Sequence, residues 1–179
     1  MISTLLQRHA AAIGLTLTLA TGAAQAVLVP QVLGFEDLGV SVIGSPMPAG
    51  YADFSWGTQW FYMTNAVDLS KNYLVTSTIN GNLIKRADGA DFYFDGADFW
   101  SRRGLDANGS FYFVLYHNGV TVYDGTQAKK GRMRFTGTPT FLKAPYTGPI
   151  DAMAFSFRNR DYNHFAMDNF RVRIDVPAQ

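Results

Sequence analysis

The segment FYFVLYHNGVTVYDG, residues 111–125, contains the clearest structural signal in the chain. Two runs of aromatic and β-branched residues flank Asn118-Gly119, and Asp124-Gly125 follows the second run. Such side chains favour strands. Asn-Gly between two apolar runs is the strongest short-range signal for a hairpin, because both residues tolerate positive φ. The segment therefore predicts strands over residues 111–116 and 120–123, connected by a tight turn.

Similar short runs recur between turn signals on both sides of this hairpin. Strands are predicted over residues 31–38, 51–56, 73–79, 92–94, 99–100, 132–136, 140–143, 152–157 and 164–174, with Asp95-Gly96 as a turn. No stretch has sustained helical periodicity, and no linker divides the chain. This pattern predicts an all-β protein, a two-layer antiparallel β-sandwich of the jelly-roll kind.

The composition agrees with that fold and narrows the chemistry. The chain has 14 Phe, 9 Tyr and 3 Trp, and aromatic residues favour strands. Glu36 is its only glutamate, and it has no cysteine. Disulfides and thiol catalysis are therefore excluded, and stability is expected from the core, with a metal ion as a possible addition.

The first 26 residues have the three parts of a secretory signal peptide. Arg8 and His9 precede an apolar run over residues 10–20, and Ala24-Gln25-Ala26 supplies the small residues that signal peptidase requires. The run is about half of the roughly 20 residues that span a bilayer. We expect cleavage after Ala26 and one β-sandwich domain over residues 27–179, secreted or periplasmic and without a membrane anchor.

The mature chain is expected to be nearly neutral. The whole chain has 15 basic and 14 acidic residues, and loss of Arg8 leaves 14 of each. Without an excess of positive charge, neither nucleic acid nor anionic lipid is an expected partner.

Two segments resemble a known group of proteins. The first is FEDL (residues 35–38) followed by PMPAGYADFSW (residues 46–56), and the second is HFAMDNF (residues 164–170). Together they resemble secreted bacterial β-sandwich proteins of the PEP-CTERM-associated type. The bracketing of the chain by these motifs is also similar to that of galactose-binding-like jelly rolls, whose first and last strands lie together. Residues 171–179 contain no sorting signal, so its processing is not expected.

The resemblance implies a structural calcium ion where the first and last strands meet. Galactose-binding-like domains often hold one there, which points to Glu36 or Asp37 from the first strand and to Asp168 from the last. Calcium takes six to eight hard oxygen ligands, mostly carboxylates and carbonyls. Neighbours in a strand face opposite sides, so only one of Glu36 and Asp37 is expected at a shared site. The alternative is that these carboxylates cap strand ends or pair with Arg171 or Arg173.

Five aromatic side chains are candidates for binding a sugar ring. They are Trp56, Trp60, Tyr62, Trp100 and Tyr116. Trp60 and Tyr62 share one face of a strand, so that pair would form an exposed platform if Phe61 lay in the core. The alternative for each is a place in the core, since a sandwich of this size needs many inward aromatic residues.

Three functions are compatible with these features. The leading hypothesis is an exported, non-catalytic binding module for carbohydrate, with calcium as a structural cofactor. The second is an extracellular structural or matrix component that meets a surface protein or itself. The third is a secreted hydrolase, whose Ser-His-Asp triad would need His117 or His164; no catalytic motif singles out either histidine.

Overall fold

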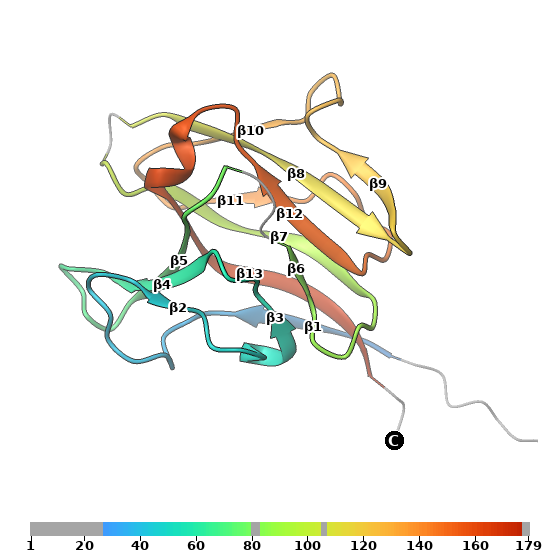
Figure 1. The fold of residues 1–179 in the computed structure, drawn as a ribbon, viewed down its shortest axis with the longest axis horizontal. Coiled ribbons are helices and arrows are strands. Elements are labelled where there is room, and N and C mark those ends of the chain that lie inside the picture. Colours follow the sequence, from blue (N-terminus) through green and yellow to red (C-terminus); the bar gives the residue numbers. More distant parts are fainter. Residues whose placement is uncertain (1–26, 80–82, 105–106, 177–179) are drawn as a thin grey trace, which may run out of the picture.

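The computed structural model describes residues 27–79, 83–104 and 107–176, and within them the chain is all-β (Figure 1). Two antiparallel sheets pack face to face, which confirms the predicted β-sandwich. These residues contain no α-helix, only the 3-10 turns η1 (Tyr51–Asp53) and η2 (Arg160–His164). No helix in this part of the chain has the length and apolar character to cross a membrane. The predicted signal peptide lies outside the described residues.

We call the larger sheet A and the smaller sheet B. Sheet A consists of β1 (Val27–Leu33), β2 (Ser45–Pro46), β4 (Trp60–Thr64), β5 (Asn72–Thr76), β7 (Phe92–Ser101), β11 (Thr140–Lys143) and β13 (Phe165–Val176). Its order is β11-β7-β13-β5-β4-β2, with β1 also beside β13. Sheet B consists of β3 (Phe54–Ser55), β6 (Ile84–Arg86), β8 (Gly109–His117), β9 (Val120–Asp124), β10 (Arg132–Phe135) and β12 (Ala152–Ser156). Its order is β10-β8-β12-β6-β3, with β9 also beside β8.

The predicted hairpin is confirmed as β8 and β9. The strands pair antiparallel up to His117 and Val120. The two residues between them have positive φ, 51° at Asn118 and 73° at Gly119. These values are the ones that a tight hairpin turn requires and that Asn-Gly accepts.

The first and last strands of the domain lie side by side (Figure 1). β1 runs antiparallel to the C-terminal half of β13, from Val27 opposite Val176 to Leu33 opposite Phe170. β5 occupies the same edge of β13 further along, where Met167 faces Leu74. Residues 34–38 therefore emerge beside the middle of β13.

The predicted strand over residues 31–38 is wrong in its second half. β1 ends at Leu33, and FEDL forms a turn in which Leu38 N donates to Phe35 O at 3.1 Å. Phe35 is fully buried, and the amide of buried Asn72 donates to the carbonyls of Phe35 and Leu38, each at 2.8 Å. This buried amide accounts for the turn, because it satisfies backbone acceptors that would otherwise need a neighbouring strand.

Asp95-Gly96 is not a turn, contrary to the prediction. β7 continues through it from Phe92 to Ser101, and Gly96 has φ 137° in a bulge opposite Arg171. A side chain at Gly96 would collide with the carbonyl oxygen of Leu142 and the ring of Phe141. Glycine is therefore needed here for a bulge and for the close approach of a neighbouring strand. The Asp-Gly dipeptide occurs in such bulges as well as in turns.

The other strand predictions hold to different degrees. Residues 51–56 contain η1 and only the two-residue β3, and the strand predicted over 73–79 ends at Thr76. β10, β11, β12 and β13 begin and end within two residues of their predicted bounds. β2 and β6 were not predicted as strands, and β4 was predicted only in that Trp60 and Tyr62 were placed on one face of a strand.

Aromatic rings fill the space between the sheets. Phe99 and Phe165 from sheet A and Phe111 and Phe155 from sheet B are at most 2% exposed and contact one another, with ring centroids 4.8–5.8 Å apart. Edge-to-face and tilted pairs of this kind stabilise a core beyond the area that they bury. The aromatic content of the sequence is thus used mainly inside.

Candidate functional site

The outer face of sheet A contains a small pocket with acidic and aromatic walls. Its volume is about 310 Å³. The carboxylates of Glu36, Asp98 and Asp168 and the rings of Tyr73 and Trp100 line it, together with Lys71 and the amides of Asn65 and Asn169. We call it the acid–aromatic pocket. It unites Glu36 and Asp168, which were predicted together as calcium ligands, with Trp100, which was predicted as a candidate for sugar binding.

Strand register places the aromatic wall. Trp100 on β7 lies opposite Ala166 on β13, so both share the outer face. Because Ala166 is small, Tyr73 on β5 reaches across it to Trp100, and the two rings meet edge to face with centroids 5.3 Å apart. Trp100 remains only partly buried. One indole ring is thereby held at the pocket by a neighbouring ring.

Register also brings two like charges together. Asp98 lies directly opposite Asp168 on the outer face, an arrangement that destabilises a sheet unless it is compensated. Asp98 is compensated, because Arg171 donates to its two oxygens at 2.8 and 3.3 Å and the Asn169 amide donates to it at 2.8 Å. The positive charge of Arg171 is therefore committed to Asp98.

Asp168 has no such compensation. Its carboxylate accepts a hydrogen bond from Asn169 N at 2.6 Å, and no lysine or arginine among the described residues forms an ion pair with it. Burial, followed by the charges of Glu36 and Asp98, raises the pKa of Asp168 to about 6, while Lys71 acts in the opposite direction. The pocket therefore contains a carboxylate whose charge is costly at neutral pH.

This carboxylate predicts a pH dependence of stability with a defined sign. Folding raises the pKa of Asp168 from 3.8 to about 6. The contribution of its protonated carboxyl group to the free energy of unfolding is therefore fully present below about pH 4 and is lost as the pH rises through 6. Asp168→Asn should therefore raise the free energy of unfolding at pH 8 by roughly 1–2 kcal/mol, allowing for solvent screening, and leave it unchanged at pH 4. Urea unfolding at both pH values measures this.

Asp98→Asn is the matched control for that experiment. It weakens the ion pair with Arg171, so it should not stabilise the protein at pH 8. An equal effect of Asp168→Asn at pH 4 and pH 8 would contradict the assigned pKa.

The three predicted calcium ligands are only partly brought together. Glu36 and Asp168 line the same pocket, whereas Asp37 accepts a hydrogen bond from the Tyr51 hydroxyl and does not line it. Burial and this contact with Asp37 raise the pKa of Tyr51. In the residues that the structure describes, no group of three or more His, Asp or Glu side chains is placed to hold a metal ion.

Most of the predicted sugar-binding aromatics are not at the surface. Trp60 is 0% exposed and Trp56 is 3% exposed, and Tyr62 packs partly against the core. The proposed Trp60–Tyr62 platform is therefore wrong: the inward face of β4 is the one with Trp60, and Phe61 is only partly buried. Trp100 lies in the acid–aromatic pocket, and Tyr116 lies on the outer face of sheet B.

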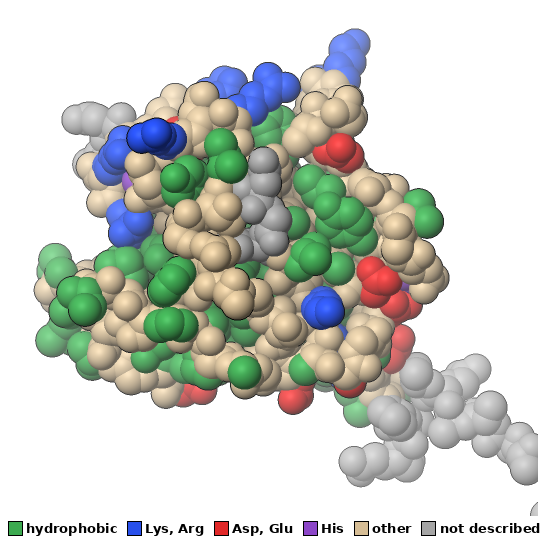
Figure 2. Space-filling view, in the orientation of Figure 1, with side chains coloured by type: hydrophobic (Ala, Val, Ile, Leu, Met, Phe, Trp, Pro, Cys, Tyr) green, Lys and Arg blue, Asp and Glu red, His purple; other side chains and the backbone are tan. Residues whose placement is uncertain are grey.

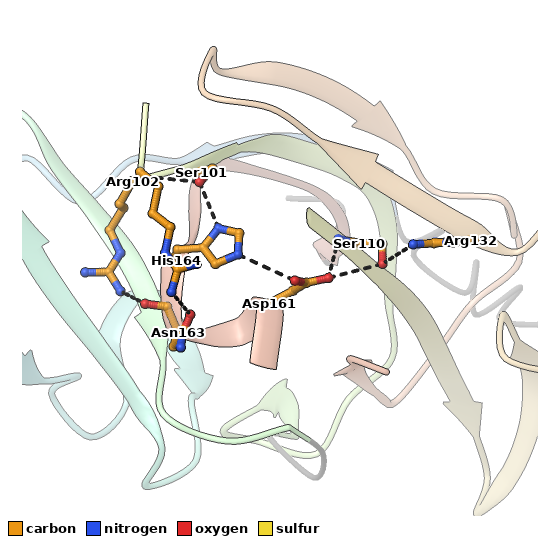
Figure 3. A network of polar contacts seen from close by, with 8 residues as sticks. Ser101, Arg102, Ser110, Arg132, Asp161, Asn163 and His164 are labelled. Carbon is orange, nitrogen blue, oxygen red and sulfur yellow. Dashed lines mark hydrogen bonds and ion pairs between the residues drawn. The ribbon is translucent and has the colours of Figure 1, made fainter. Parts of the chain in front are cut away.

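A Ser-His-Asp constellation that the sequence did not reveal surrounds His164 (Figure 3). Ser101 Oγ lies 2.8 Å from His164 Nδ1, and His164 Nε2 lies 3.5 Å from Asp161 Oδ1. Asp161 in turn accepts a hydrogen bond from Ser110 N at 3.0 Å. Burial and Arg103 lower the pKa of His164, which therefore stays neutral at pH 7.

The constellation lacks an accessible nucleophile. Ser101 is 2% exposed, and the hollow beside the network is lined by His164 and Asp161 but not by Ser101. A substrate carbonyl would have to approach within about 3 Å of the nucleophile. The hydrogen bonds and ion pair of this constellation connect η2 to β7 and β8, so they stabilise the fold. The other candidate, His117, pairs with Asp91 at 3.1 Å beside the hairpin turn.

Comparison with known proteins gives no family. No protein-family model matches this chain, and no curated protein sequence matches it significantly.

Proposed function

We propose that this protein is an exported, non-catalytic binding module that holds a sugar ring in the acid–aromatic pocket. The observation that supports this most is the position of Trp100, a partly exposed indole beside carboxylates and amides. Export is motivated by the leader-like residues 1–26.

The chemistry of the pocket suits a pyranose. A sugar ring has an apolar face, which stacks on an aromatic side chain, and a rim of hydroxyl groups. Asp98 and Asp168 supply acceptors for those hydroxyls, and Lys71 and Asn169 supply donors. The volume of about 310 Å³ is at the lower end of the roughly 300–1,000 Å³ of small-ligand sites. This size fits a single ring, either a free sugar or one unit of a chain.

A binding panel tests the proposal. Residues 27–179 would be applied to a glycan array and titrated by calorimetry with glucose, galactose, mannose, xylose and glucosamine, with and without calcium. Saturable binding of at least one sugar is expected. A blank array and flat titrations in both conditions would contradict the proposal.

Calcium is a second proposal for the same pocket. Glu36 and Asp168 would contribute carboxylate oxygens, and their mutual repulsion, which helps to raise the pKa of Asp168, is what a divalent ion would relieve. Because no three carboxylates of the described residues are grouped closely enough to hold a metal ion, backbone carbonyls, amide oxygens and water would complete the shell.

Metal removal tests the calcium proposal without reference to sugar. Calcium at a concentration well above its Kd should raise the melting temperature by mass action, and Glu36→Gln should abolish that rise. A melting temperature unmoved by chelation, together with no metal in elemental analysis, would contradict it.

A structural or matrix role is the alternative, and one surface feature favours it. Five exposed aliphatic side chains gather on the two loops beside β4, at the left in Figure 2: Val40, Val42, Ile43, Val67 and Leu69. The loop that contains Val40, Val42 and Ile43 is held to β4 by hydrogen bonds between Ser41 and Thr64. Exposed apolar patches often mark interaction surfaces. Concentration-dependent association in light scattering, abolished by Val42→Ser with Ile43→Ser and unaffected by sugars, would favour this role.

A further inference from the structure

The outer face of sheet B contains a second and larger hollow. Its volume is about 870 Å³, and its floor is formed by Val114 and Tyr116 from β8 and by Ala152, Ala154 and Ser156 from β12. Figure 2 shows hydrophobic side chains gathered over these strands, with acidic side chains at the margin. We call it the sheet B groove. It lies on the opposite side of the sandwich from the acid–aromatic pocket.

Strand register explains the groove. Met153 and Phe155 point into the core, so the alternate residues of β12 face outward. Ala152 pairs with Tyr116 on one side and with Lys85 on the other. A row of small side chains on the central strand therefore lies between larger side chains on both neighbours, which forms a trough.

The margin of the groove is polar and has both charges. Asp124 and Asp151 line one side, and Lys85 lies across the floor from Tyr116. Asp151 Oδ2 accepts a hydrogen bond from Asn118 N at 2.7 Å, and Asp124 Oδ1 accepts two from Thr126. Both carboxylates are thereby held in place, each with a second oxygen available to a ligand.

We infer that the sheet B groove binds a glycan chain, so that the module holds polysaccharide on both faces and cross-links it. The inference rests on the proposed sugar binding. An apolar floor with one aromatic ring suits the faces of successive pyranose rings, and the charged margin suits their hydroxyls. The two carboxylates disfavour a polyanion, and the charged margin disfavours an aliphatic chain. The groove has more than twice the volume of the acid–aromatic pocket, which favours several rings.

Two sites on opposite faces give a measurable consequence. One rigid domain that binds two chains joins them into larger assemblies, because each bound molecule links two polymers. Soluble β-1,3-glucan, β-1,4-xylan and α-1,6-dextran would be mixed with residues 27–179, and assembly would be followed by light scattering. Hexasaccharides of the same three polymers, which cannot be cross-linked, would report binding by calorimetry.

Ala154→Phe fills the floor of the groove from its outer side. It should reduce scattering to the level of polymer alone while leaving hexasaccharide binding at the acid–aromatic pocket. Lys143→Phe, an exposed position on β11 that lines neither hollow, is the matched control and should scatter as wild type. If Ala154→Phe lowers the melting temperature, Asp151→Asn combined with Lys85→Ala replaces it, with a tenfold loss of scattering efficiency expected.

The outcomes separate the two proposals. If Ala154→Phe scatters as wild type with polymer and Trp100→Ala loses hexasaccharide binding, the groove is not a glycan site and the proposed function stands. Loss of all binding in Ala154→Phe, with none lost in Trp100→Ala, would overturn the acid–aromatic pocket as the sugar site. A wild-type protein that binds none of the three polymers or hexasaccharides would overturn the groove as a glycan site, whereas the proposed function is overturned by a blank array and flat titrations in the sugar panel.

Discussion

Replacing Trp100 by alanine should weaken sugar binding at the acid–aromatic pocket by about 30-fold or more. The indole forms the aromatic wall of the pocket beside Asp98 and Asp168, and removing such an aromatic anchor commonly costs at least about 2 kcal/mol of binding free energy. Calorimetric titration of wild type and Trp100→Ala with the sugar identified by the panel measures the loss.

Tyr93→Ala is the matched control. Tyr93 is another partly exposed aromatic residue on the outer face of β7, where it packs under the guanidinium of Arg173, with 4.8 Å to its ring centroid. It does not line the pocket, so its removal should leave the affinity unchanged. Equal losses in both variants would mean that the strand as a whole, and not the indole, supports binding. An unchanged affinity in Trp100→Ala would contradict the proposed site.

Phe111→Ala should be the most destabilising of the single substitutions considered. Phe111 is fully buried on β8, and its ring meets Phe113, Phe155, Phe135 and Phe157, as well as Phe99 and Phe165 of the opposite sheet. Its removal would leave a cavity where the two sheets meet. Large-to-small changes at such phenylalanines cost about 3–5 kcal/mol, which urea unfolding at pH 7 would measure.

A conservative change separates packing from aromaticity. Phe111→Leu keeps much of the volume and should cost about 1–2 kcal/mol. Val120→Ala, at a position 64% exposed on β9, should change the free energy of unfolding by less than about 0.5 kcal/mol. A loss of under 1 kcal/mol in Phe111→Ala would contradict the aromatic core as the main connection between the sheets.

The sequence predicted the fold class because its strongest signals are local. Asn118-Gly119 determines a hairpin by backbone conformation alone, and the continuous run of aromatic and aliphatic residues before it identifies β8. The prediction that the first and last strands are neighbours is also confirmed, because Leu33 pairs with Phe170. The predictions from sequence were wrong where one motif occurs in two kinds of structure. The Asp-Gly dipeptide at Gly96 forms a bulge instead of a turn, and FEDL forms a turn held by Asn72 instead of a strand.

The candidate site was predictable only in part, since its members meet through long-range register. Glu36 and Asp168 were predicted from the resemblance to galactose-binding-like jelly rolls, whose first and last strands lie together. Trp100 could not be preferred over Trp60, because the inward face of a strand depends on the sheet opposite. Asp98 was missed for a related reason: its pairing with Arg171 and its position opposite Asp168 require the register of β7 on β13.

The chain has three tryptophans, and this gives a direct test of the acid–aromatic pocket. Each has one indole N–H that NMR resolves, and two of them, in Trp56 and Trp60, are at most 3% exposed in the core. During titration with the sugar identified by the panel, the Trp100 resonance should shift with saturation while the other two stay in place. A Trp100 resonance that does not move while the sugar binds would contradict the site.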